Sequence, residues 1–107
     1  MAPLEADDAK LVTLARGAMA RAEALSGAAV RDRDGRTYAG APVGLRSLRL
    51  SALQVAVAGA LASGAGEFET AVLVGGADDD PGLAALAEAS PSAAVIRTDR
   101  RGEPLDA

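Results

Sequence analysis

Residues 50–57 read LSALQVAV, and this stretch decides how the rest of the chain is interpreted. Its apolar residues recur three or four positions apart, which is the spacing of one face of an α-helix. The apolar face comprises Leu50, Leu53, Val57, Ala60 and Leu61. We predict a helix that starts at the hydroxyl of Ser51, buries Leu53 in the core and ends at the Ser63-Gly64 pair.

Strand and helix patterns alternate around this central helix. In order, we expect a helix over 7–25, a hairpin over 28–40, the central helix, a strand over 70–74, a helix over 80–89 and a strand over 93–96. The Asp34-Gly35 pair favours the hairpin turn, and the apolar run at 70–74 is typical of a strand covered on both faces. This alternation predicts a three-layer α/β fold.

The composition limits the classes of protein to which the chain can belong. Its 107 residues suffice for one domain spanning 1–107, in which we expect 1–8 and 98–107 to be loose termini. The net charge of −4 disfavours nucleic-acid binding, and no apolar run is long enough for a membrane helix. The start of the chain is acidic where a signal peptide would be basic, so we expect a cytoplasmic protein.

The chain contains no cysteine and no histidine. The lack of cysteine removes disulfides and thiolate metal ligands together. The lack of histidine leaves Ser51 without the usual base that would activate it as a nucleophile. Alanine dominates the apolar residues, and Tyr38 and Phe68 are the only aromatic ones, so helices must approach closely to form a core.

Four segments, taken in order, resemble the cytidine deaminase family. They are GAAVRDRDGRTYAG (27–40), SALQVAV (51–57), EFETAVLV (67–74) and AEASP (87–91) followed by AVI (94–96). The resemblance covers roughly residues 10–97. It implies a three-layer α/β/α sheet that is shortened at the C-terminus, because the family's later strand and helix are mostly missing after Ile96.

The family's reaction needs a zinc ion held by one Cys or His and two Cys, together with a glutamate that moves protons. The resemblance places the first ligand at Ser51 and the glutamate at Leu53, and neither side chain suits its role. It places the paired cysteines at Asp79 and Gly82, or at Gly82 and Ala85 in the other register. We therefore expect no zinc, no other cofactor and no catalytic residue.

Segments that line the substrate in that family are altered as well. The loop ALSG (24–27) is shortened and lacks the family's phenylalanine, and PVG (42–44) replaces the sugar-binding pattern. Loss of the metal ligands, the proton shuttle, the base pocket and the sugar clamp together is hard to reconcile with deamination.

Four other clusters have a ligand-binding interpretation and a simpler one. Asp78-Asp79-Asp80 is either a cation site or a solvated loop with a helix cap at Asp80, and Gly75-Gly76 either approaches a phosphate or ends a strand. Arg46 and Arg49 either hold an anion or lie at a solvated helix end. Arg97, Arg100 and Arg101 either contact nucleic acid or form a solvated tail. We favour the simpler interpretation of each cluster.

The resulting hypothesis is a catalytically inactive cytidine-deaminase-like domain that serves as an interaction or scaffold protein. The resemblance implies a homo-oligomer, a dimer or tetramer, and an unidentified protein partner is possible. We place Ala52, Ala56 and Ala60 at the subunit interface because small residues permit close helix packing. One alternative is a binder of a nucleoside or similar small ligand without turnover. Another is an active zinc-dependent cytidine deaminase.

Overall fold

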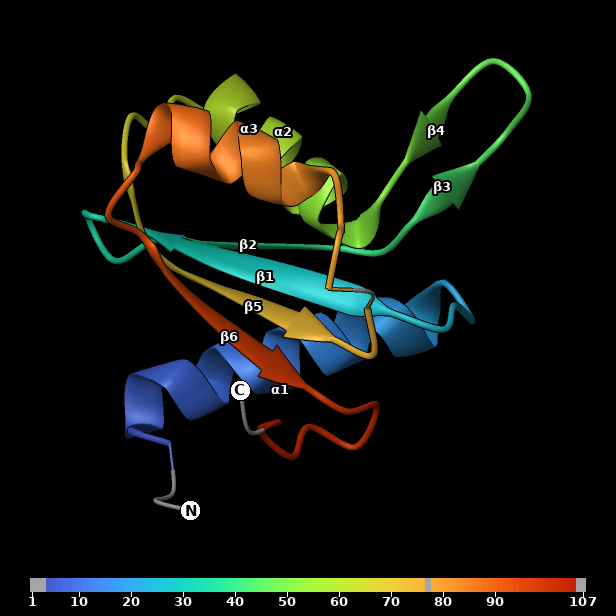
Figure 1. Cartoon of the computed structure of the whole chain (residues 1–107), viewed down its shortest axis with the longest axis horizontal. Coiled ribbons are helices and arrows are strands. Elements are labelled where there is room, and N and C mark those ends of the chain that lie inside the picture. The colour runs from blue at the N-terminus through green and yellow to red at the C-terminus, as the bar shows by residue number, and fades with distance from the viewer. Residues whose placement is uncertain (1–3, 77, 106–107) are drawn as a thin grey trace.

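A four-stranded sheet in the order β2-β1-β5-β6 forms the middle layer of the fold (Figure 1). The structure is a computed structural model that describes residues 4–76 and 78–105. The strands are β1 (Gly27–Asp32), β2 (Thr37–Gly40), β5 (Phe68–Val74) and β6 (Ala94–Thr98). Strand β1 pairs antiparallel with β2 and β5, whereas β5 and β6 are parallel and are joined through a helix.

Three helices cover the two faces of this sheet. Helix α1 (Ala6–Arg21) packs on one face, and α2 (Ala52–Ala62) and α3 (Gly82–Ala89) lie together on the other (Figure 1). The predicted three-layer α/β/α arrangement is confirmed. Among the described residues, no helix is both long and apolar enough to cross a membrane.

Strand β5 contributes to both halves of the core, as its continuous apolar run predicts. Ala71 and Leu73 belong to the cluster beneath α2 and α3, whereas Val72 and Val74 belong to the cluster beneath α1. Successive side chains of a strand point to opposite faces, so each β5 residue serves the layer that it faces. Phe68 is the largest fully buried side chain and lies in the α2 and α3 cluster.

The β1–β2 hairpin is closed by the side chain of Asp32. Its Oδ1 accepts the N–H groups of Asp34 at 3.0 Å and Arg36 at 2.9 Å, and its Oδ2 accepts Arg36 Nε at 3.0 Å. Burial alone would raise the pKa of Asp32, but the hydrogen bonds from Arg36 and Asp34 hold that pKa below its ordinary value. Gly35 takes a φ of 86°, which confirms the predicted turn.

Helix α1 ends earlier than predicted. It stops at Arg21, where Glu23 adopts a φ of 52° and Ala24 N–H donates to the carbonyl of Met19 at 2.9 Å. This left-handed cap usually carries glycine, so the sequence pattern did not reveal it. Leu25, predicted to lie on the apolar face of the helix, is 71% exposed in the following loop. Leu61 of α2 is also exposed, contrary to its predicted place in the apolar face.

Both ends of the chain carry more structure than the predicted loose termini 1–8 and 98–107. Residues 6–8 form the first turn of α1, and Asp8 pairs with Arg31 at 3.0 Å. Thr98 is buried at the end of β6, and the chain then turns back so that Leu105 N–H donates to the carbonyl of Arg97 at 2.9 Å. Residues 1–3 and 106–107 lie outside the described residues.

A second, two-stranded sheet was not predicted. Strands β3 (Val43–Gly44) and β4 (Arg49–Leu50) pair antiparallel and project away from the main sheet as a small hairpin (Figure 1). Its turn is closed by Leu45 N–H, which donates to the carbonyl of Leu48 at 2.8 Å. The predicted loop around Pro42 and Gly44 is therefore partly ordered as strand, and we call residues 43–50 the arm.

Candidate functional site

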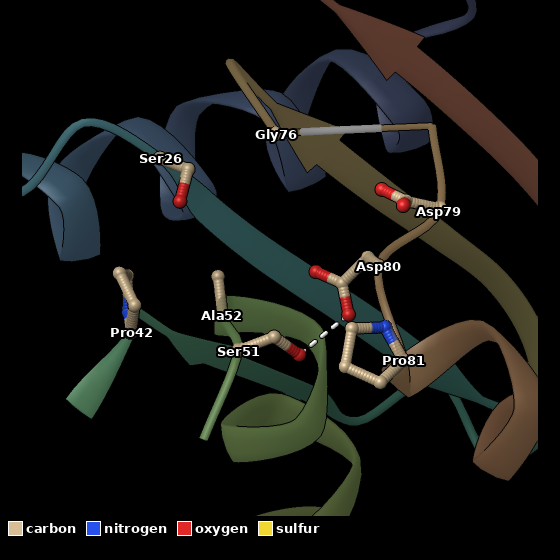
Figure 2. Close-up of a pocket in the computed structure, with 8 residues that line it drawn as sticks. All are labelled: Ser26, Pro42, Ser51, Ala52, Gly76, Asp79, Asp80 and Pro81. Carbon is tan, nitrogen blue, oxygen red and sulfur yellow. Dashed lines mark hydrogen bonds between the residues drawn. The ribbon is translucent and has the colours of Figure 1, made fainter. Parts of the chain in front are cut away.

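A pocket of about 330 Å³ opens where α2 and α3 both begin, beside the carboxyl end of β5 (Figure 2). Its lining consists of Ser26, Pro42, Ser51, Ala52, Gly76, Asp79, Asp80 and Pro81. The segment that follows a parallel strand and precedes a helix is a common place for a binding site in α/β folds. The sequence-predicted positions Ser51 and Asp79 both contribute to this lining.

Ser51 caps the start of α2 through both its side chain and its own backbone N–H. Its Oγ accepts the N–H of Gln54 at 3.1 Å, and its own N–H donates to Gln54 Oε1 at 2.9 Å, which together form a capping box. The predicted role of Ser51 as a helix-start hydroxyl is confirmed. Because Oγ can also donate, Ser51 makes a further bond, which reaches Asp80 Oδ1 at 2.5 Å (Figure 2).

Asp80 lies between the starts of the two helices. Its side chain is buried, and Oδ1 accepts the N–H of Gly82 at 2.7 Å as well as the Ser51 hydroxyl. The exposed N–H groups at a helix start favour a negative charge, so the Asp80 carboxylate is stabilised at this place. The predicted helix start is shifted by one residue, because the N-cap is Pro81 instead of Asp80 and α3 begins at Gly82. The Asp80 carboxylate still accepts the first N–H of that helix.

The sequence did not reveal the Ser51–Asp80 bond. The two residues are 29 positions apart, and each has a complete local explanation as a helix cap. Only the close approach of α2 and α3 brings them together. The signal that could have found the pair is the coincidence of two polar caps before two helices that pack on the same face of one sheet.

Gly82 allows that close approach. A Cβ at this position would lie 2.6 Å from Leu53 Cβ and 2.7 Å from Gln54 N, so a larger residue would push the helices apart. Leu53 itself is fully buried in the core cluster beneath α2 and α3. The prediction that Leu53 belongs to the core is confirmed, and Gly82 belongs to a tight seam between the two helices.

The predicted interface residues of α2 lie inside the chain. Ala52, Ala56 and Ala60 are at most 2% exposed and pack in the core cluster with β1 and β5. The small side chains do permit close packing, but against the sheet of the same chain. The prediction that these three alanines form a subunit interface is therefore wrong.

The remaining candidate clusters take different positions. Asp79 is exposed at the pocket, and Asp78 is exposed and lies 3.6 Å from Arg97 Nε. Arg46 and Arg49 belong to the arm instead of the predicted helix end.

Arg100 and Arg101 line a shallower pocket of about 420 Å³ beside Gly75 and Gly76. Glu103 N–H and Arg101 N–H both donate to Asp99 Oδ1, and these hydrogen bonds hold the pKa of Asp99 below its ordinary value.

A family model for cytidine deaminase-like proteins matches residues 4–102. The chain belongs to the cytidine deaminase-like family. Its fold is similar to that of cytidine deaminase from Burkholderia pseudomallei, with a TM-score of 0.75 and 26% identity over 90% of this chain and 87% of that chain. A search of curated protein sequences gave no match.

Two mycobacterial structures show the same fold. Cytidine deaminase from Mycobacterium leprae matches with a TM-score of 0.72 and 19% identity over 87% of this chain and 89% of that chain. Cytidine deaminase from Mycobacterium tuberculosis matches with a TM-score of 0.71 and 24% identity over 94% of this chain and 89% of that chain. At these identities the likeness establishes the three-layer architecture.

The donor atoms at the paired helix starts do not fit the zinc ion that the family's chemistry requires. A catalytic zinc is usually held by three thiolate, imidazole or carboxylate ligands. Here Ser51 offers a neutral hydroxyl, Gly82 has no side chain, and Asp79 is exposed. Asp80 is the buried carboxylate at this site, and it already accepts two hydrogen bonds. Across residues 4–76 and 78–105, no three His, Cys, Asp or Glu side chains form a group that could hold a metal.

Proposed function

We propose that the chain is a catalytically inactive member of the cytidine deaminase-like family that acts as an interaction domain. The observation that carries this proposal is the Ser51–Asp80 hydrogen bond, at the position to which the resemblance assigns the first metal ligand. Zinc catalysis needs a metal-bound water and a group that moves protons between this water and the base. The resemblance assigns that role to the position of Leu53, and a buried leucine can neither accept nor donate a proton.

The test is ammonia release from cytidine by the purified full chain, incubated beforehand with zinc sulfate. We expect no release above a protein-free blank, even at micromolar protein and over hours. An active cytidine deaminase run in the same buffer shows that the assay detects turnover. Ammonia release that increases with the concentration of the chain and stops in chelator would contradict the proposal.

A second candidate is a binder of a nucleoside or a similar small ligand, and the 330 Å³ pocket favours it. A pocket of this size lies at the lower end of the range that holds small molecules. Thermal unfolding in a panel of nucleosides and nucleotides tests this candidate, because a bound ligand raises the apparent stability in proportion to RT ln(1 + [L]/Kd).

The structure offers a matched pair of variants for that panel. Ser26→Phe would fill the pocket, so any true shift should disappear. Ser63→Phe lies at the exposed end of α2, outside the pocket lining, and should keep the shift. The absence of any shift in the wild-type chain leaves the interaction domain as the function that the geometry supports best.

A further inference from the structure

Two clusters that lie far apart in the sequence line one pocket of the structure. Gly75 and Gly76 follow β5, Arg100 and Arg101 follow β6, and all four line the pocket of about 420 Å³. Because β5 and β6 are parallel neighbours, their carboxyl ends lie at the same edge of the sheet. In open α/β sheets, ligands bind outside the carboxyl ends of such strands. We call this cavity the strand-end pocket.

The segment that carries the two arginines is a structured turn. The chain leaves β6 at its carboxyl end and folds back (Figure 1). Asp99 N–H donates to the carbonyl of Glu103 at 2.9 Å, and Gly102 N–H donates to the carbonyl of Asp99 at 3.0 Å. Asp99 Oδ1 accepts the N–H groups of Arg101 and Glu103. These bonds hold the backbone of Arg100 and Arg101 in one conformation, which reduces the entropy that a ligand must overcome on binding.

The turn is also fixed against the rest of the chain, through two glycines. A Cβ on Gly102 would lie 2.8 Å from Val12 Cγ1, so the turn packs closely on α1. A Cβ on Gly75 would lie 2.6 Å from Arg100 Cγ, so the aliphatic part of Arg100 lies directly over Gly75. Gly75 has a φ of 68°, which glycine adopts without strain. The end of β5 therefore positions the side chain of Arg100.

The strand-end pocket carries exposed positive charge although the chain as a whole is acidic. The net charge is −4, yet Arg100 and Arg101 are exposed, and neither pairs with a carboxylate within residues 4–76 and 78–105. The neighbouring carboxylates have other contacts. Asp78 lies 3.6 Å from Arg97 Nε, and Oδ1 of Asp99, which lines the pocket, accepts two backbone N–H groups. Two guanidinium groups in one pocket suit a phosphate group, which arginine binds through paired hydrogen bonds.

The strand-end pocket has an apolar wall as well. Leu105 lines it and is 52% exposed, and its N–H donates to the carbonyl of Arg97 at 2.9 Å. Inorganic phosphate would leave this leucine in water, whereas an organic group attached to the phosphate would cover it and gain from the burial. A volume of about 420 Å³ lies within the range of small-molecule pockets.

The same features disfavour a nucleic acid as the ligand. A nucleic acid binds through many phosphate contacts, which an acidic chain does not favour. Single strands also stack their bases on aromatic side chains. The two aromatic residues of this chain, Tyr38 and Phe68, belong to the core cluster beneath α2 and α3 instead of the strand-end pocket.

We propose that the strand-end pocket binds a small organic phosphate monoester. Arg100 and Arg101 hold the phosphate group, and Leu105 covers the adjoining organic part. The site lies on the loops that follow β5 and β6, beside the pocket at the starts of α2 and α3, with which it shares Gly76. The proposal goes beyond the proposed function and does not depend on it.

The experiment is isothermal titration calorimetry of the full chain at low salt with three probes, namely phenyl phosphate, inorganic phosphate and phenol. We expect phenyl phosphate to bind saturably at one site per chain. Inorganic phosphate should bind at least about fivefold more weakly, because it leaves the leucine uncovered. Phenol, which lacks the phosphate group, should show no saturable binding.

Three variants separate the two parts of the site. Arg100→Gln/Arg101→Gln should weaken both phosphate probes at least about tenfold, because charge-assisted hydrogen bonds are lost. Leu105→Ser should weaken phenyl phosphate and leave inorganic phosphate unchanged. Arg46→Gln/Arg49→Gln is the matched control, since these two arginines are also exposed but lie on the arm, and it should bind both probes like wild type. Circular dichroism confirms that each variant is folded.

A wild-type chain that shows no saturable binding of phenyl phosphate would overturn the proposal, as would binding that persists in the Arg100→Gln/Arg101→Gln variant. A single-stranded oligonucleotide that binds more tightly than phenyl phosphate, and loses this affinity in the same variant, would also overturn it and assign the arginines to a nucleic-acid surface. Failure of the proposed function is distinguishable from these results, because it is measured separately as ammonia release from cytidine.

Discussion

Ser51 is the residue on which the two helix starts depend. It closes the capping box of α2 and donates to Asp80, so its hydroxyl serves both helices. We predict that Ser51→Ala destabilises the fold by about 1–2 kcal/mol, the usual cost of a lost cap together with a hydrogen bond. Urea unfolding followed by far-UV circular dichroism measures this cost, which suits a chain without tryptophan.

Ser63→Ala is the control for that prediction. Ser63 is exposed at the other end of α2, and its side chain takes part in no hydrogen bond among the described residues. We expect its replacement to change the unfolding free energy by less than about 0.5 kcal/mol. Equal effects of the two serine variants would contradict the structural role assigned to Ser51.

Asp32 should make the hairpin sensitive to acid. Its pKa in the folded chain lies below that of the unfolded chain, which is about 4 for aspartate. The contribution of Asp32 to stability is therefore present above pH 4 and is lost as the pH falls through the folded pKa. We predict that Asp32→Asn is less stable than wild type at pH 7 and that the difference shrinks at pH 3.

Urea midpoints at the two pH values measure this difference, with Asp34→Asn as the control. Asp34 lies in the same turn but is exposed, and its pair with Arg36 is long at 3.3 Å. Such a surface pair contributes little, so the control should stay close to wild type at pH 7. An Asp32→Asn deficit that is the same at pH 7 and pH 3 would contradict the assignment.

At the residue scale, the sequence predicted Leu53 as core and Ser51 as a helix-start hydroxyl, but it missed the contact between Ser51 and Asp80. Helical spacing identified Leu53 as core, and the Asp80-Pro81 pair identified a helix start. The Ser51–Asp80 bond depends on where α2 and α3 sit relative to each other, which no local pattern specifies. The same reason explains the wrong prediction for the alanines of α2. Small residues suit packing against the chain's own sheet as well as packing against another subunit, and the sequence does not distinguish the two.

At the element scale, the seam between α2 and α3 depends on the absence of a side chain at Gly82. We predict that Gly82→Ala destabilises the fold by about 1–3 kcal/mol, because the added Cβ meets the backbone and Cβ of α2. Gly59→Ala is the matched control within α2, where a Cβ meets nothing within 4 Å. It should stabilise the fold by about 0.5–1 kcal/mol, since alanine is the better helix former. Urea unfolding that ranks the two variants in the opposite order would contradict the seam.

Leu53 is fully buried in the core, at the position to which the resemblance assigns the glutamate. Leu53→Glu would place a carboxylate at a fully buried site, and we predict a loss of about 3 kcal/mol or more. Leu61→Glu, on the exposed side of the same helix, should cost less than about 0.5 kcal/mol. Thermal unfolding by circular dichroism measures both variants. If the Leu53→Glu variant were as stable as wild type, this position would be able to accept a carboxylate, contrary to its place in the packed core.

Elements with a sustained apolar pattern were predictable, although the end of α1 was not. The strand β5 and the helix α2 carry long apolar patterns, and both appear close to their predicted bounds. The arm has strands of two residues each, which is too short for any alternation to show. The end of α1 depends on a non-glycine residue, Glu23, in the left-handed region, and this has no sequence signal.

At the scale of the whole molecule, the chain keeps the deaminase layers and joins the starts of α2 and α3 through its own side chains. In zinc proteins, metal binding contributes to folding, and removal of the metal destabilises the chain. Here the Ser51–Asp80 bond and the close contact at Gly82 hold the same two helices together. We therefore predict that this seam is stable without a metal.

The most direct measurement is the urea-unfolding free energy of the full chain in excess chelator and in stoichiometric zinc. We expect the same unfolding free energy in both solutions, within about 0.5 kcal/mol. A ligand that binds only the folded chain raises the free energy of unfolding, and about 4 kcal/mol is expected when it is present at a thousand times its Kd. A stabilisation of that order by zinc would contradict this expectation and would show that the folded chain binds zinc.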